Sequence, residues 1–220
     1  MRLSLSSISK TYHTVVQGST GSFSLNQATG FNSTDRALQL YFTGTRVLSR
    51  LGANPPVQLG DVFINATSLL SVFDQFRIMK AQVDVYYTNN SSGLNNTLQL
   101  PIIFGVVDKD DAGPLSSSAN ALAYSTCKTL QMGNSSGEGG GKQTMYVNRP
   151  SITQASAQTA AATPSILAST NVPSPWIDNA YEAVEHFGLK FWVDNTNVTS
   201  AAIGNVTFVT RLFVHYRNLK

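Results

Sequence analysis

The chain of 220 residues is long enough to bury one sizeable hydrophobic core, and all-β proteins of this length often form a single domain. Charged residues make up only 12% of the sequence, against roughly 25% in a typical soluble domain. The single cysteine, Cys127, excludes an internal disulfide framework. No apolar run approaches the ~20 residues of a membrane span, and residues 1–10 lack the hydrophobic segment of a signal peptide. We therefore expect one soluble domain over residues 1–220, neither secreted nor bound to a membrane.

The first part of the chain predicts short strands. Residues 1–20 form an N-terminal arm or a first strand, because Thr11–Gln17 alternates after a serine-rich start. Short strands are expected next at Gly21–Asn26 and Leu38–Phe42. Between Arg46 and Pro56, weak amphipathic spacing followed by a double proline predicts a helical turn that ends in a loop.

The stretch from residue 61 to residue 112 contains the clearest strand signals. Near-helical spacing predicts a short helix over Asp61–Phe73. A half-buried strand over Arg77–Tyr87 follows, with Met79, Ala81, Val83, Val85 and Tyr87 on one face and Lys80, Gln82 and Asp84 on the other. After a polar loop, Leu98–Val107 is apolar on both faces, which is typical of a strand deep inside a sheet.

The next segment predicts another helix and a hairpin. Serines can cap a short helix within Leu115–Ser125, whose apolar side would be Ala119, Leu122 and Ala123. A strand at Thr126–Met132 and a returning strand at Lys142–Asn148 flank the glycine-rich residues 133–141. Because the glycine spacing does not fit a phosphate-binding loop, a flexible hairpin tip is favoured there.

The last third of the chain combines an irregular segment with two strong strand patterns. Residues 149–175 are rich in Ala, Ser, Thr, Gln and Pro, and they predict a long surface loop. Val184–Val193 and Asn205–Arg217 then alternate clearly between apolar and other side chains. The whole profile predicts an all-β fold, a single eight-stranded antiparallel jelly-roll sandwich with short helices in the connecting loops.

The order of these elements resembles a known family. A short helix, the strand FDQFRIMKAQVDVYY, a polar loop, the strand LPIIFGVVDKDDA, the helix ANALAYS and the strand TCKTLQM occur in sequence. This order resembles the single jelly-roll capsid proteins of small circular single-stranded DNA viruses, the circovirus-like (CRESS-DNA) group. The most specific element is the aromatic-Asp-x-aromatic-Arg-Ile start of the first strand, together with the Asp-rich end of the second. The resemblance covers residues 61–132 and 184–217 best.

The resemblance implies a structural protein and no enzyme. Many identical copies would assemble into an icosahedral shell, most simply a T=1 shell, that encloses single-stranded DNA. The protein would then be found in the virion, and in the host nucleus during assembly, while the host-cell receptor stays unidentified. One alternative is an all-β carbohydrate-binding or adhesin module with Trp176, Tyr181 and Trp192 as its sugar platform. A second is the shell domain of a small plus-strand RNA virus coat protein.

Nucleic acid is the partner for which the charge pattern gives candidate residues. The net charge is +3, and both ends of the chain are basic whereas the acidic residues collect in the middle. Family members usually begin with a long basic arm, but here only Arg2 and Lys10 precede the first expected strand. Folded-surface charges could neutralise the genome instead. The candidates are Arg2, Lys10, Tyr12, His13, Arg211, His215 and Arg217, with Phe213 as a further stacking side chain.

Catalytic and metal sites are not predicted. No nucleophile motif is present, and the three histidines lie on separate strands without other ligands at zinc spacing. We expect no cofactor. Asp108, Asp110 and Asp111 could supply oxygen ligands to calcium between subunits, but capping and turn formation is the favoured interpretation of these three residues.

Overall fold

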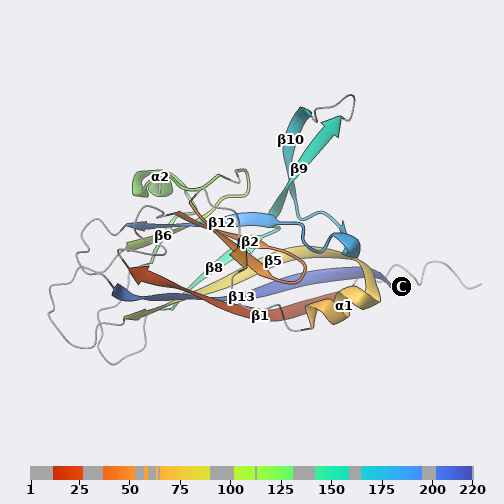
Figure 1. The fold of residues 1–220 in the computed structure, drawn as a ribbon, viewed down its shortest axis with the longest axis horizontal. Coiled ribbons are helices and arrows are strands. Elements are labelled where there is room, and N and C mark those ends of the chain that lie inside the picture. Colours follow the sequence, from red (N-terminus) through yellow and green to blue (C-terminus); the bar gives the residue numbers. More distant parts are fainter. Residues whose placement is uncertain are drawn as a thin grey trace, which may run out of the picture.

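The structure is a computed structural model in which two antiparallel β-sheets face each other across one core (Figure 1). It describes residues 12–26, 37–52, 57–58, 63, 65–89, 102–111, 113–130, 142–158, 165–194 and 202–219. The five-stranded sheet consists of β1 (Tyr12–Asn26), β13 (Ala202–Leu219) and β5 (Phe73–Asn89), with β8 (Lys142–Asn148) and β11 (Ile177–Asp178) both paired to β5.

The eight-stranded sheet is built around β12. Its central strands are β2 (Ala37–Phe42), β12 (His186–Asp194), β6 (Ile102–Val107) and β7 (Lys128–Leu130). It is extended on one side by β3 (Val47–Leu51) and β4 (Val57–Gln58), and at the start of β12 by β9 (Ser151–Gln158) and β10 (Ser165–Pro173).

The connectivity of the two sheets confirms the predicted all-β jelly roll. Along the chain, β1, β5, β8 and β13 belong to the five-stranded sheet and alternate with β2, β6, β7 and β12 of the eight-stranded sheet. Strands that cross between two sheets in this order form the paired Greek keys of a jelly roll. The remaining strands, β3, β4, β9, β10 and β11, are additions to these eight.

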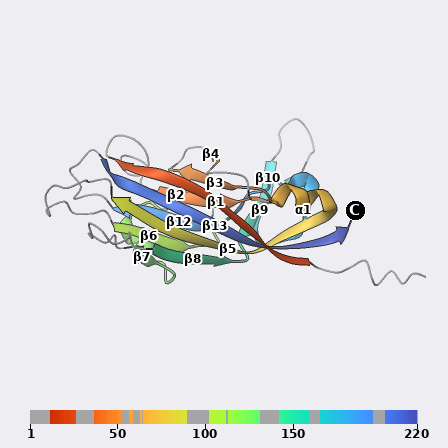
Figure 2. The same cartoon turned by 90° about the horizontal axis from the view of Figure 1, so that it is seen from below.

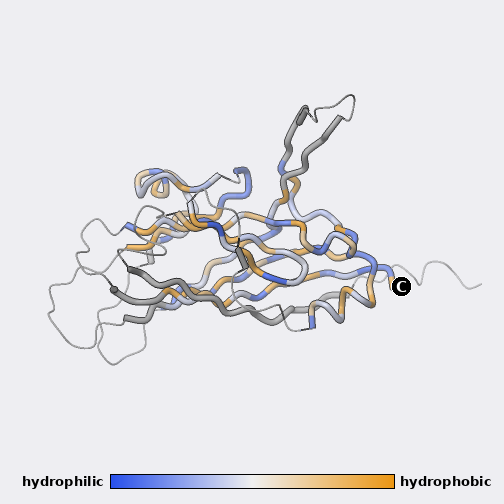
Figure 3. Tube along the Cα trace, viewed as in Figure 1, coloured by the Kyte–Doolittle hydropathy of each residue, from blue (hydrophilic) through white to orange (hydrophobic). Residues whose placement is uncertain are grey.

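Period-two patterning explains why the sheets sandwich a core. Along β13, residues 206, 208, 210, 212, 214 and 216 are buried, whereas the residues between them are only half-buried. Figure 3 shows the corresponding alternation of apolar and polar positions along the strands. Aromatic side chains fill the space between the layers, and the Phe191 and Phe208 rings lie 5.3 Å apart. Each buried aromatic ring of this kind stabilises the sandwich through the large apolar area that it removes from water.

Two short helices lie in connections, as expected. α1 (Ala66–Val72) buries Ala66 and Leu70 beneath the start of β5. α2 (Ser118–Leu122) begins after Ser117, whose hydroxyl accepts a hydrogen bond from the Asn120 N–H at 3.0 Å. The predicted apolar side of this helix is wrong: Ala119, Leu122 and Ala123 are exposed, and Ala121 is the residue that packs inward.

Two predicted irregular segments are strands instead. Val47–Leu51 pairs with β2, because a tight turn in which Thr43 Oγ1 accepts from the Arg46 N–H returns the chain beside its predecessor. This pairing outweighs the weak helical spacing. Most of residues 149–175 form the β9–β10 hairpin, which projects away from the two layers (Figure 1). Strands that pair with each other outside the core need no inward apolar face, so their composition resembled that of a loop. The glycine-rich residues 133–141 lie outside the described residues.

One buried histidine makes stability depend on pH. His186 is fully buried, with Nδ1 near the Phe42 and Val184 carbonyl oxygens at 3.2 and 3.1 Å. Its Nε2 has no hydrogen-bond partner among the described residues. Burial lowers the pKa of His186 to about 4, although the two carbonyl contacts oppose this shift.

Because this folded-state pKa lies below the ordinary value of 6.5, protonation favours the unfolded chain. The free energy of unfolding should be greatest above pH 6.5 and should fall by up to ~3 kcal/mol from this group as the pH drops toward 4. Urea unfolding of disassembled subunits between pH 4 and 7 measures this slope. His186→Gln should flatten the slope, and His215→Gln, at a half-buried position, should retain it. An unchanged slope in the His186 variant would contradict the assignment.

Candidate nucleic-acid interface

The outer face of the five-stranded sheet, which is turned away from the core, is strongly cationic. We call it the basic face; Figure 2 shows β1, β13, β5 and β8 side by side in this sheet. Its described cations are Arg77 and Lys80 from β5, Lys142 from β8, Arg211 and Arg217 from β13, and Arg149 directly after β8. The carboxylates that the described strands add to it are those of Asp84 and Asp178. Such an imbalance attracts anionic partners.

A β-bulge places Arg77 on this face. Phe213 pairs with Lys80 and Val214 pairs with Ile78, so Met79 has no partner on β13. In a regular strand, Arg77 and Lys80 would point to opposite sides because they are three residues apart. The Met79 carbonyl oxygen accepts from the Arg149 N–H at 2.7 Å. The bulge therefore brings Arg77 and Arg149 to the same part of the face.

A buried carboxylate holds two of the cations side by side. Asp84 is fully buried; its Oδ2 accepts from Arg211 Nη1 at 2.8 Å and lies 3.1 Å from Lys142 Nζ. Its Oδ1 accepts from Thr144 Oγ1 at 2.7 Å and from Gln82 Nε2 at 3.2 Å. Burial raises the pKa of Asp84, but these four contacts together outweigh burial and lower the pKa to about 2. Asp84 is therefore ionised at neutral pH and fixes the positions of Lys142 and Arg211.

Aromatic rings alternate with the cations across the basic face. Lys80 Nζ lies 4.1 Å from the centroid of the Tyr146 ring and 5.0 Å from that of Phe213. Lys142 Nζ lies 5.7 Å from the Tyr86 ring. Contacts of this kind stabilise cations by roughly 0.5–1 kcal/mol at exposed sites. Because 44% of the Tyr146 side chain is exposed, the face presents both charge and a ring surface to a partner.

The structure brings together three of the predicted nucleic-acid residues. Arg211, His215 and Arg217 lie on the basic face, and so does Phe213. Arg211 is partly neutralised by Asp84. Tyr12 and His13 lie in β1 opposite Tyr216 and His215. Arg2 and Lys10 lie outside the described residues.

Sequence reasoning missed Arg77, Lys80, Lys142 and Arg149 as members of the site. The alternation around Lys80 placed this residue on the solvent side of its strand. The pairing of β5 with both β8 and β13, which makes the four cations neighbours, involves residues far apart in the chain. No local pattern reports such a pairing.

The acidic cluster after β6 forms a turn, as the favoured interpretation predicted. Asp108 Oδ1 accepts from the N–H groups of Asp110 and Asp111 at 3.0 and 3.2 Å. Its Oδ2 accepts from Lys190 Nζ at 2.7 Å and from the Tyr124 hydroxyl at 2.9 Å. Burial raises the pKa of Asp108, but these donors outweigh burial and keep it below its ordinary value. Within the described residues, no group of three or more His, Cys, Asp or Glu side chains could hold a metal ion.

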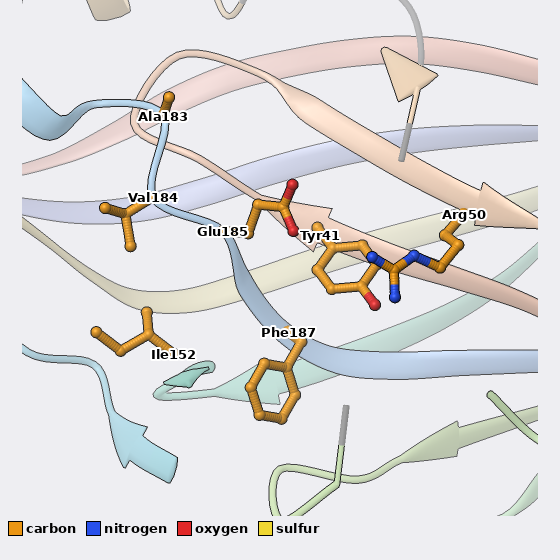
Figure 4. Close-up of a pocket in the computed structure, with 7 residues that line it drawn as sticks. All are labelled: Tyr41, Arg50, Ile152, Ala183, Val184, Glu185 and Phe187. Atoms are coloured by element: carbon orange, nitrogen blue, oxygen red, sulfur yellow. The ribbon is translucent and has the colours of Figure 1, made fainter. Parts of the chain in front are cut away.

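A cavity of about 430 Å³ lies against the eight-stranded sheet, near the base of the β9–β10 hairpin (Figure 4). Its lining residues are Tyr41, Arg50, Ile152, Ala183, Val184, Glu185 and Phe187. The Arg50 guanidinium lies 5.2 Å from the Tyr41 ring centroid, and the Tyr41 hydroxyl donates to Gln39 at 2.8 Å. Burial raises the pKa of Tyr41, although the charge of Arg50 opposes this shift. With polar and apolar ends but no histidine, cysteine or serine in its lining, the cavity offers no nucleophile and base pair.

The family model for circovirus capsid protein matches residues 6–220. The chain belongs to this family. It is thus a viral capsid protein, a subunit of virus particles, as the resemblance predicted. A comparison with curated protein sequences gives no match.

Solved capsid structures share the fold of this capsid protein. The crystal structure of the 60-mer BFDV capsid protein is 15% identical over 96% of this chain and 95% of that chain, with a TM-score of 0.51. The decameric BFDV capsid protein is 16% identical over 95% of this chain and 100% of that chain, with a TM-score of 0.46. A semi-empty virus-like particle of Macrobrachium rosenbergii nodavirus is 9% identical over 96% and 94%, with a TM-score of 0.41.

The carbohydrate-binding alternative is not favoured for this capsid protein. Its three expected platform residues are not gathered on one surface. Trp176 lies against Arg217 at the five-stranded sheet, whereas Trp192 packs with the small cluster around α2 on the other sheet. Tyr181, which is 67% exposed, belongs to the turn η2 (Asn179–Tyr181). None of the helices in the described part of the chain is long and apolar enough to cross a membrane.

Asp84→Asn tests the carboxylate that organises Lys142 and Arg211. Because the folded-state pKa of Asp84 is lowered, its ionised form stabilises the subunit above pH 3.8, and this contribution is lost as the pH falls toward 2. We expect the variant to lose about 1–2 kcal/mol of unfolding free energy at pH 7, and less at pH 3. Urea unfolding measures the difference.

The exposed Asp110 provides a control, and Asp110→Asn should change stability by less than ~0.5 kcal/mol. An Asp84 variant as stable as the parent at pH 7 would show that the two cations need no organising carboxylate.

Proposed function

We propose that the capsid protein turns its basic face toward the inside of the particle, where this face binds packaged single-stranded DNA. The observation that carries the proposal is the cationic excess of this face, with aromatic rings between the charges. Sequence-independent binding of a single strand needs this combination, because cations neutralise phosphates and rings stack on bases. The basic face would then supply part of the charge that family members usually carry on a basic arm.

The eight-stranded sheet lacks a comparable free cation at its centre. Lys190, its central lysine, is 2% exposed and is neutralised by Asp108 at 2.7 Å and by Asp111 at 3.5 Å. On the five-stranded sheet, the one buried carboxylate is shared between Lys142 and Arg211. The difference favours the five-stranded sheet as the surface that meets nucleic acid.

A shell of sixty copies in T=1 arrangement is the assembly that we propose. The support is the fold shared with the BFDV capsid protein, which was crystallised as a 60-mer. Closed shells of identical subunits are generated by rotational symmetry without open ends. Native mass measurement of purified particles should give sixty times the subunit mass plus that of the packaged nucleic acid. A filament, or a closed particle of another copy number, would contradict this assembly.

The proposed role is structural, without catalysis. It places the protein in the virion and, while new particles form around DNA, in the host nucleus. The support for the nuclear step is membership of a family of DNA-virus capsid proteins. Imaging of the tagged chain in cells that replicate the viral DNA tests this step, and particles that assemble only in the cytoplasm would contradict it.

Loss of two lysines from the basic face should weaken DNA binding in a salt-dependent way. Each cation that contacts a phosphate adds about 0.7 to the slope of log affinity against log salt for single strands. Lys80→Gln combined with Lys142→Gln should therefore reduce this slope by about 1.4 in filter binding of an oligothymidylate.

The matched control removes two lysines near the other sheet, with the same change in net charge. Lys109→Gln combined with Lys128→Gln should leave the slope unchanged, because these residues lie after β6 and in β7. Equal effects of the two double variants would mean that DNA binding follows net charge and not the basic face.

A further inference from the structure

Three arginines of the basic face lack a carboxylate partner. Arg77, Arg149 and Arg217 are near one another, and within the described part of the chain no carboxylate lies within 4 Å of any of them. Arg77 Nε donates to Ser174 Oγ at 3.3 Å, and Arg217 Nε donates to Gln75 Oε1 at 2.6 Å. Burial, together with the charges of Arg149 and Arg217, lowers the pKa of Arg77. Neutral partners orient these side chains and leave their charge uncompensated.

A strained backbone supports this arginine cluster. Arg149 and Ser174 have φ angles of 53° and 47°, in the left-handed region that residues other than glycine seldom adopt. Such conformations cost roughly 1–3 kcal/mol each and persist only where the surroundings enforce them. Ser174 is buried, its N–H donates to the Pro150 carbonyl at 2.9 Å, and its hydroxyl donates to the Ile78 carbonyl at 2.6 Å. The two strained residues flank the β9–β10 hairpin and fix its ends against the bulge in β5.

An aromatic ring completes the cluster. The guanidinium carbon of Arg217 lies 4.2 Å from the Trp176 ring centroid, and that of Arg77 lies 5.8 Å from it. Trp176 is half-buried and follows Ser174 by two residues. The indole is therefore held between charged groups at the edge of the cluster.

We propose that Arg77, Arg149, Arg217 and Trp176 form a nucleotide subsite. The three guanidiniums bind a backbone phosphate, and the neighbouring base packs against Trp176 and Arg217. This inference rests on the proposed function and names a ligand position within the basic face. Guanidinium groups match the geometry of phosphate oxygens and stack on planar rings. The other cations differ, since Asp84 already binds Lys142 and Arg211, and two rings flank Lys80.

A phosphate fits better than a protein carboxylate. Three uncompensated guanidiniums exceed the charge of a single carboxylate, whereas a nucleic-acid backbone brings successive phosphates. The ring beside the cluster has a natural partner in a base, and base stacking on an aromatic side chain is worth about 1–3 kcal/mol. An acidic peptide is the competing ligand that the experiment must separate.

Tryptophan fluorescence tests the subsite directly. The chain has two tryptophans, so Trp192→Phe in the full-length protein leaves Trp176 as the only reporter. Disassembled subunits are titrated at low salt with an oligothymidylate, an abasic oligomer of the same length and an oligoglutamate. We expect the oligothymidylate to quench Trp176 emission strongly and the abasic oligomer to quench it weakly, with lower affinity. Oligoglutamate should bind more weakly than either.

Substitutions then identify the phosphate ligands. In the same background, Arg149→Gln and Arg217→Gln should each weaken oligothymidylate binding about tenfold. Lys128→Gln, which removes one charge from β7, should have no effect. Arg217→Lys keeps the charge but loses the planar group, and it should reduce the quenching more than it reduces the affinity. Thermal melting confirms that each variant is folded.

The outcomes separate this subsite from the proposed function. If the oligothymidylate binds but Trp176 emission is unchanged, the subsite is refuted while DNA binding by the basic face stands. Tighter binding of oligoglutamate than of the oligothymidylate would replace the subsite with a contact for an acidic protein segment. No binding of any oligomer at low salt would overturn both the subsite and the proposed function.

Discussion

The antiparallel pairing of β5 with β13 is the interaction on which the rest of the structure depends. These are the two longest strands, and their register extends from Phe73 opposite Leu219 to Asn89 opposite Gly204. The register directs alternate residues of both strands into the core, and it sets Arg211 and Arg217 beside the cations of β5. The bulge at Met79 shifts the alternation once, which adds Arg77 to the same side. One pairing thus builds both the hydrophobic core and the charged outer face.

The two sheets treat buried charge differently, and this difference underlies the proposed role. Near the eight-stranded sheet, Asp108 accepts hydrogen bonds from Lys190 and Tyr124, so the ion pair is closed within the subunit. Loss of one partner from such a buried pair costs about 3–5 kcal/mol. On the five-stranded sheet, Asp84 positions Lys142 and Arg211 without neutralising the whole face. Uncompensated cations of this sheet remain available to an external polyanion.

Most of the strands were predictable because their signals are local. The alternation at 184–193 and 205–217 and the polar hairpin ends each depend on neighbouring residues only. The β9–β10 hairpin was missed because it packs outside the core and therefore lacks an apolar face. The basic face was half predicted: Arg211, His215 and Arg217 share one strand, whereas Lys80 and Lys142 join them through long-range pairing. Neither the bulge at Met79 nor the left-handed Arg149 has a sequence signature of its own.

The orientation of the five-stranded sheet within the particle is the most direct test of the central claim. A high-resolution cryo-electron microscopy reconstruction of DNA-filled particles would show which sheet meets the packaged genome. We expect nucleic-acid density against the face that carries Lys80, Arg211 and Arg217, with the β9–β10 hairpin directed away from it. Density that contacts the other sheet alone, or a basic face exposed on the outside of the shell, would contradict the claim.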